Sequence, residues 1–141
     1  MKLVKSIMKR NPCYTAGRKI TVRGLMLHSV GCPQPDASAF INSWNSPLHK
    51  SACVHAFIDG NSGTAYQTLP WNRRGWHCGS GSRGSANNTH IGVEMCEPAC
   101  IRYTSGSKFT CPDTASAKAA VKRTYETAVE LFAMLCRKYG L

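Results

Sequence analysis

Alternation of hydrophobic and polar residues predicts several short strands along the chain. ITVRGLMLHS at 20–29 has this pattern, and HIGVEMCE at 90–97 repeats it. CVHAFID at 53–59 and TAYQTLP at 64–70 flank turn-forming glycines and polar residues, and they form the clearest hairpin signal in the sequence. The pattern therefore predicts at least four strands.

Three other segments are predicted to be helical. Residues 3–10 form a short one, Asp36 can cap a second that runs through about Trp44, and the longest covers 114–139 and ends at Gly140. In the longest, apolar residues recur at steps of four and three and predict one buried face: Val121, Tyr125, Ala128, Phe132, Leu135 and Tyr139. Strands interspersed with helices indicate an α/β domain with a central sheet flanked by helices.

Length and composition predict one domain covering residues 1–141. Its hydrophobic content of 43% is that of a globular protein, and no repeat or linker divides it. No apolar run approaches the roughly 20 residues of a membrane helix. The N-terminal MKLVKSIMKRN lacks the apolar segment and cleavage site of a signal peptide, so synthesis in the cytoplasm without membrane insertion is expected.

The chain is strongly basic, with a formal net charge of +11. This charge favours a polyanionic partner, either nucleic acid, anionic lipid or an acidic cell-wall polymer, although a merely solvated basic surface explains it as well. The basic residues do not interleave with aromatic residues as in nucleic-acid-binding proteins, so no nucleic-acid partner is predicted.

Eight cysteines are scattered through the sequence without a CxxC pair. Cys96, Cys100 and Cys111 form the one cluster, and it lacks a fourth ligand at zinc-site spacing. Buried thiols are favoured, then one or two disulfides, and then a structural zinc. The pairing cannot be deduced from the sequence.

Two residues of the predicted strands could carry chemistry. His28 lies on the strand face opposite Leu25 and Leu27, where it can face a cleft, although a structural histidine is the commoner case. Glu94 lies within an otherwise apolar strand, where burial is costly without a partner. A salt bridge to a basic group, or a role as general base with a raised pKa, would account for it.

Aromatic residues and histidines near glycine-rich loops are further candidates. Trp76 and His77, in RRGWHCGSG, could form an apolar wall for a sugar or peptide, or plug the sheet edge. His55 shares a strand face with Phe57 and could belong to the core or line a groove.

Taken together, LMLHSVG, VHAFID-x-x-SGTAYQTLP, RRGWHCG and NNTHIGVEM resemble zinc-dependent N-acetylmuramoyl-L-alanine amidases of the peptidoglycan-recognition-protein type, a family with many phage endolysins and bacterial autolysins. The resemblance covers roughly residues 20–141. It implies a mixed central sheet with helices on its faces. It also implies hydrolysis of the amide between N-acetylmuramic acid and the L-alanine of the stem peptide, at the cell wall, reached by phage release or another secretion route.

The resemblance also implies roles for single residues. His28 corresponds to the first zinc ligand, and Glu94 to the general base that handles the attacking water. Trp76, His77 and Asn87 match positions that line the substrate groove or hold its shape. Zinc in such a site lowers the pKa of bound water to about 7 and polarises the carbonyl.

The sequence departs from the family after the long helix. There the family carries its other two zinc ligands, a histidine and then an aspartate or cysteine, whereas this sequence stops at KYGL and has no histidine after His90. A longer amidase truncated at its C-terminus is the favoured hypothesis. The alternatives are a non-catalytic module that binds muropeptides, and a site rebuilt from substitute ligands such as Cys32, His55 or His77.

Overall fold

A five-stranded mixed sheet forms the centre of the computed structural model, which describes all 141 residues. The strands lie in the order β1 (Leu3–Lys5), β4 (Ala65–Gln67), β3 (Ala56–Ile58), β7 (His90–Met95) and β2 (Gly24–Ser29). Strand β7 runs parallel to both β2 and β3, whereas β3 and β4 form an antiparallel pair. The predicted α/β class, mixed sheet and hairpin are therefore confirmed.

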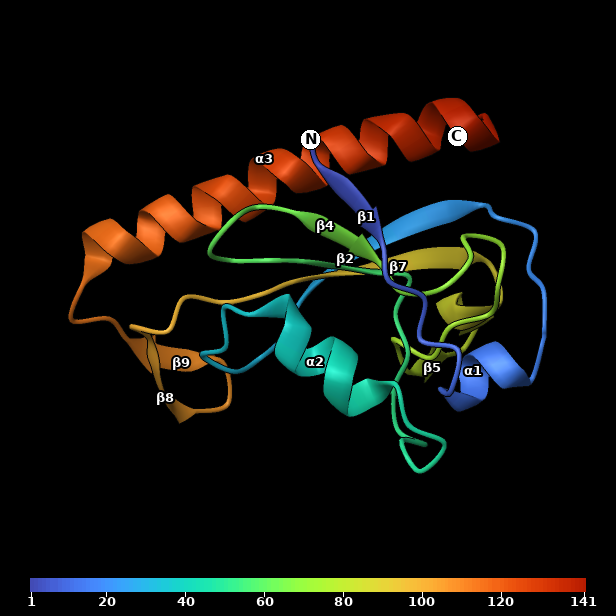
Figure 1. Cartoon of the computed structure of the whole chain (residues 1–141), viewed down its shortest axis with the longest axis horizontal. Helices are drawn as coiled ribbons and strands as arrows, with labels where there is room; N and C mark the ends of the chain where they lie inside the picture. Colours follow the sequence, from blue (N-terminus) through green and yellow to red (C-terminus); the bar gives the residue numbers. More distant parts are fainter.

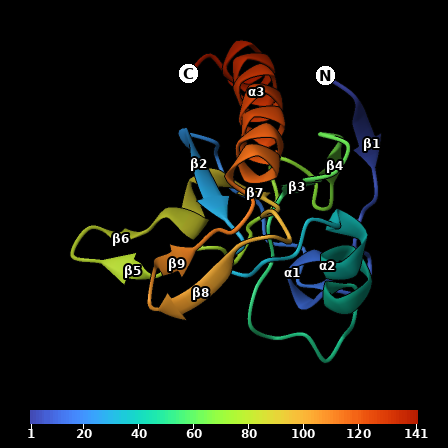
Figure 2. The same cartoon turned by 90° about the vertical axis from the view of Figure 1, so that its left-hand side faces the viewer.

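Helices cover both faces of this sheet, as Figures 1 and 2 show. The long helix α3 (Thr114–Tyr139) crosses one face, while α1 (Pro12–Thr15) and α2 (Ala37–Trp44) lie on the other. The remaining elements are two small hairpins and one turn of 3-10 helix: β5 (Ser80–Gly81), β6 (Gly84–Ser85), η1 (Ala86–Asn88), β8 (Arg102–Ser105) and β9 (Lys108–Thr110).

Strand alternation divides the core into two layers. Ile91 and Val93 of β7 pack with Leu131 of α3 on one face. On the opposite face Phe57 of β3 stacks on Phe40 of α2, with ring centroids 5.1 Å apart. Residues that alternate with the α3-facing ones, including His28 and Glu94, therefore point away from α3.

The prediction of a helix at residues 3–10 is wrong. Leu3–Lys5 is the edge strand β1, paired in parallel with β4, and the pairing continues where the Ser6 amide donates to the Gln67 carbonyl at 2.8 Å. The side chain of Met8 is fully buried beyond it. A free sheet edge and a buried pocket for Met8 thus outweigh local helix propensity.

The bounds predicted for α3 are confirmed, including its end at Gly140 in the left-handed conformation. Its predicted apolar face is wrong in the first half, because the Val121 and Tyr125 side chains are about half exposed. Thr124 and Thr127 are buried in their place. Their hydroxyls donate to the carbonyls of Val121 and Gly63, so burial leaves no polar atom unpaired.

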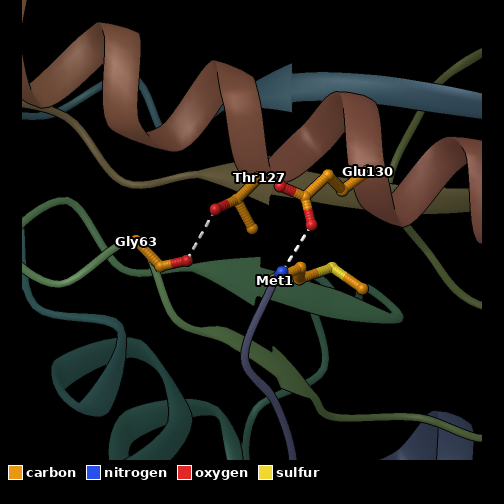
Figure 3. A network of polar contacts seen from close by, with 4 residues as sticks. All are labelled: Met1, Gly63, Thr127 and Glu130. Atoms are coloured by element: carbon orange, nitrogen blue, oxygen red, sulfur yellow. Dashed lines mark hydrogen bonds and ion pairs between the residues drawn. The ribbon is translucent and has the colours of Figure 1, made fainter.

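Polar contacts hold α3 to the loop before β4 and to the N-terminus (Figure 3). Thr127 Oγ1 donates to the Gly63 carbonyl at 2.8 Å, and the Met1 ammonium pairs with the Glu130 carboxylate. The first contact is buried, whereas the Glu130 side chain is largely exposed. The buried hydrogen bond is therefore the stronger constraint on the helix position.

The second predicted helix is confirmed over Ala37–Trp44, with Asp36 at its N-cap position. The Asp36 side chain makes no capping bond, however, and Asp59 Oδ2 instead accepts from the Ala37 amide at 3.0 Å. A carboxylate from a distant turn thus caps the helix. None of the helices combines the length and the apolar character that crossing a membrane requires.

Candidate functional site

The register between β2 and β7 brings His28 and Glu94 together. These residues are direct neighbours across the two parallel strands, near the carboxyl end of each. Leu25 and Leu27 pack toward α3, so the His28 ring faces the other side of the sheet, as the sequence predicted. The ring is half-buried. An edge of the sheet with strand ends and polar side chains is a common place for a site in α/β proteins.

His77 completes this group from a distant loop. His28 Nε2 lies 3.1 Å from His77 Nδ1, and His77 Nε2 donates to the His90 carbonyl at 3.2 Å. This second bond assigns the proton of His77 to Nε2, so Nδ1 accepts from His28. Burial lowers the pKa of both rings, that of His77 to about 4, so the pair is neutral at pH 7.

Gly92, in the middle of β7, makes room for the His77 ring. A Cβ atom built on Gly92 would lie 2.4 Å from His77 Cγ, far inside van der Waals contact. No other residue type therefore fits at this point of the strand with His77 in place. The glycine inside the pattern HIGVEM is the sequence signal for this close approach.

Asn87 fixes the loop that carries His77. Its side chain is buried, and Oδ1 accepts from the backbone amides of His77 and Cys78 at 2.7 and 3.2 Å. Nδ2 donates to the Cys78 carbonyl at 2.9 Å. Of the two roles predicted for Asn87, these contacts fit holding the shape of the groove.

His55 lies in the core rather than along a groove. Its ring has no exposed surface, Nε2 donates to the Arg73 carbonyl at 2.7 Å, and Nδ1 accepts from the Gly92 amide at 3.0 Å. Burial lowers the pKa of His55 to about 4, which keeps the ring neutral. Both nitrogens are occupied, so the ring organises the backbone beneath His77 and has no atom free for a ligand.

The Glu94 carboxylate has no partner for one of its oxygens. Oε2 is buried without a hydrogen bond, and the ion pairs of the structure, Met1–Glu130 and Lys122–Glu126, do not include Glu94. The salt bridge that the sequence offered as an explanation is therefore absent. Burial, with a smaller contribution from the charge of Glu97, raises the pKa of Glu94 to about 7. A carboxyl group with this pKa can both take up and release a proton near neutral pH.

A cleft of about 320 Å³ opens beside Glu94 and His77. The Trp76 side chain is 51% exposed and forms part of its wall. The cleft is lined by Trp44, Ser51, Ala52, Val54, Trp76, His77, Cys78, Gly79 and Glu94. A larger cavity of about 560 Å³ lies between α3 and the β8–β9 hairpin, and its lining includes Ser29 but neither His28 nor His77. The smaller cleft is the candidate site because it holds the unpaired carboxylate.

The residues of this cleft do not complete a zinc site by themselves. A catalytic zinc requires three protein ligands and an open position, and no group of three His, Cys, Asp or Glu side chains converges in this structure. His28 and His77 supply two imidazoles, whose facing nitrogens are engaged with each other. Cys32 does not join them, and the His55 nitrogens are bonded to backbone.

A carboxylate with a raised pKa beside neutral imidazoles, in an open cleft with an aromatic wall, marks a candidate functional site. The sequence model of the family described as N-acetylmuramoyl-L-alanine amidase matches residues 17–141. The chain belongs to this family, whose members are generally zinc-dependent.

Individual relatives agree with this assignment. Over 80 residues the chain is 50% identical to the N-acetylmuramoyl-L-alanine amidase CwlH of Bacillus subtilis (strain 168), a match covering 57% of this chain and 30% of that protein. The amidase XlyA of the same organism is 38% identical over 80 residues, covering 57% and 25%. The chain spans between about a quarter and a third of the length of the curated relatives it matches.

Solved structures share the fold. The catalytic domain of XlyA superposes with a TM-score of 0.67 at 23% identity, covering the whole of this chain and 79% of that domain. The structure of PlyL gives a TM-score of 0.69 at 19% identity and covers 100% and 76%. The predicted mixed sheet flanked by helices is thus the fold of the XlyA catalytic domain and of PlyL.

Proposed function

We propose that this protein is a peptidoglycan amidase that hydrolyses the amide between N-acetylmuramic acid and the L-alanine of the stem peptide, as an endolysin or autolysin does. Family membership supports the reaction class. The observation that carries the proposal is the Glu94 carboxylate, buried without a partner for Oε2 and lining an open cleft.

Glu94 acts as the general base in this proposal. Its carboxylate takes a proton from the water that attacks the carbonyl carbon, and the resulting acid returns the proton to the departing amine. The raised pKa fits both halves of this cycle, because a carboxyl group at its ordinary pKa is too weak a base near pH 7. The exposed Trp76 indole offers an apolar surface on which a sugar ring or peptide can lie.

His28 is proposed as one zinc ligand, with the metal supplying Lewis acidity when bound. Its half-buried ring, beside Glu94 and away from the apolar core, supports this role. Since His77 Nδ1 accepts from His28 Nε2, metal binding at that nitrogen must replace this hydrogen bond. Whatever zinc the unaltered protein retains after dialysis, measured by atomic absorption, should be lost in His28→Ala.

The test of the proposal is release of free stem peptides from purified cell wall. We expect Glu94→Gln to lower the rate roughly 10²- to 10⁴-fold, while the fold by circular dichroism and the zinc content stay unchanged. The control Glu130→Gln, on the exposed side of α3, should keep full activity. If Glu94→Gln released peptides at the unaltered rate, Glu94 would not be the base.

A binding module that recognises muropeptides without cleaving them is the second candidate function. The incomplete set of zinc ligands in the cleft favours it. This alternative predicts that the unaltered protein sediments with cell walls but releases no peptide, with or without added zinc. Binding to DNA that weakens steeply with salt, without wall binding, would instead indicate a nucleic-acid protein.

A further inference from the structure

Two cysteines that the proposed reaction does not use lie against each other beside the candidate cleft. Cys13 belongs to α1, and Cys53 lies just before β3 in a small apolar cluster with Met8 and Leu69. Cys13 packs against this cluster, while the Cys53 thiol donates to the Val54 carbonyl at 3.9 Å. The two cysteines therefore meet in one cluster, although they belong to segments far apart in the sequence.

Backbone contacts hold both cysteines in place. Asn11 Oδ1 accepts from the Cys13 amide at 2.9 Å, and Asn11 Nδ2 donates to the carbonyls of Trp44 and Ala52 at 3.0 and 3.3 Å. The buried Asn11 thus ties the start of α1 to the residue that precedes Cys53. A disulfide needs Cβ atoms about 3.5–4.5 Å apart, and rotation about the Cα–Cβ bonds then brings the two sulfur atoms to bonding distance. Packing in one cluster, with the backbone held by Asn11, favours such an approach of Cys13 and Cys53.

Only one of the two thiols is accessible to solvent. Cys13 is partly exposed and lines two surface hollows next to Trp76, whereas Cys53 is fully buried. The neighbouring Cys53 side chain and the Arg74 guanidinium lower the pKa of the Cys13 thiol to about 7. A partly exposed thiol with this pKa reacts readily with disulfides at neutral pH.

We propose that Cys13 and Cys53 form a redox-sensitive disulfide through thiol–disulfide exchange with a low-molecular-weight disulfide such as oxidised glutathione. The Cys13 thiolate attacks one glutathione sulfur, the glutathione disulfide bond breaks, and a glutathione thiolate leaves. Cys53 sulfur then attacks Cys13 sulfur in the mixed disulfide, and the second glutathione leaves. The two protein thiols lose two electrons and two protons, and two molecules of reduced glutathione form.

The cross-link acts on the wall of the cleft. Cys53 and Trp76 exchange two backbone hydrogen bonds, each 2.8 Å long. A covalent bond from α1 to Cys53 therefore fixes the strand segment that positions the Trp76 backbone. It also closes the loop of residues 14–52, which restricts the unfolded chain.

The test is peptide mapping after equilibration with oxidised glutathione and alkylation of the remaining thiols. Trypsin should release NPCYTAGR (11–18) joined to SACVHAFIDGNSGTAYQTLPWNR (51–73), about 2 Da lighter than the sum of the two peptides. We expect Cys136→Ser, a control on α3, to keep this product. In Cys53→Ala, Cys13 should carry glutathione instead, because the resolving thiol is missing.

Thermal unfolding gives a second measurement. Oxidation should raise the Tm by roughly 10 °C, and Cys13→Ser should lose this gain. The comparison is made with Cys100→Ser and Cys111→Ser in both proteins, because those two thiols also adjoin each other. Glutathione retained on Cys13 in the unaltered protein, or a cross-link from Cys13 to another cysteine, would overturn the proposal. Neither measurement depends on amidase activity.

Discussion

The substitution Gly92→Ala tests how the two site histidines are held together. The added Cβ would lie 2.4 Å from His77 Cγ and 2.6 Å from two further ring atoms, where ordinary contacts begin at about 3.4 Å. The ring must therefore move by about 1 Å, which is enough to lengthen the 3.1 Å contact between His77 Nδ1 and His28 Nε2 beyond hydrogen-bonding distance. Overpacking of this kind costs about 1–3 kcal/mol, or a fall in Tm of roughly 3–10 °C.

The assay combines thermal unfolding with ¹⁵N spectra of the histidine rings. We expect Gly92→Ala to lower the Tm and to shift the ring signals of His28 and His77 together. The matched control is Gly79→Ala at the rim of the same cleft, where an added Cβ meets nothing within 4 Å. This control should stay within about 0.5 kcal/mol of the unaltered protein.

A double-mutant cycle makes the reasoning refutable. If the clash with His77 causes the cost, Gly92→Ala should become nearly neutral in a His77→Ala background. An equal loss of stability in both backgrounds would show that the His77 ring is not the obstacle. Unchanged ring signals in Gly92→Ala would lead to the same conclusion.

Two further predictions concern stability. Thr127→Val should lower the free energy of unfolding, measured by chemical denaturation, by about 1–3 kcal/mol, because it leaves the buried Gly63 carbonyl without its donor. Glu130→Gln should change this free energy by less than about 1 kcal/mol. Equal effects of the two substitutions would show that the buried hydrogen bond is not the stronger constraint. Stability should also fall as the pH drops from about 6.5 to about 4, because the unfolded chain takes up a proton that the buried His55, with its pKa lowered to about 4, does not. In His55→Gln, the slope of the free energy of unfolding against pH should be smaller by up to about 1.4 kcal/mol per pH unit. An unchanged slope would exclude His55 as the source of the pH dependence.

The pattern of hydrophobic and polar residues predicted those helices and strands whose surroundings in the fold favour the same structure. The 26 residues of α3 have strong periodicity and a terminal glycine, and the bounds were confirmed. Its buried face was misjudged because Thr124 and Thr127 bury hydroxyls whose acceptors lie within the helix and in a distant loop. The edge strand at Leu3–Lys5 was missed for a similar reason, since its partner β4 lies about sixty residues away.

The site was partly accessible from the sequence. Alternation alone placed His28 and Glu94 away from the apolar face of their strands, and the register then made them neighbours. The contact of His28 with His77 could not be predicted, because it depends on a loop fixed by Asn87 and on the space over Gly92. The alternation of residues along a strand thus determines on which face of the sheet a side chain lies, but not which loop residue contacts it on that face.

The hydrogen bonds around the cleft distinguish the support beneath the imidazoles from the wall that contains Trp76. Beneath His77, the polar atoms of the His55 ring and the Asn87 side-chain amide are all hydrogen-bonded to backbone groups. The imidazole pair of His28 and His77 therefore rests on a support without free polar atoms. Trp76, the residue before His77, has two backbone hydrogen bonds to Cys53, and Cys13 packs against the cluster that contains Cys53. The imidazole pair therefore lies on a hydrogen-bonded support, whereas the wall proposed to hold the substrate adjoins the segment that the proposed disulfide would cross-link.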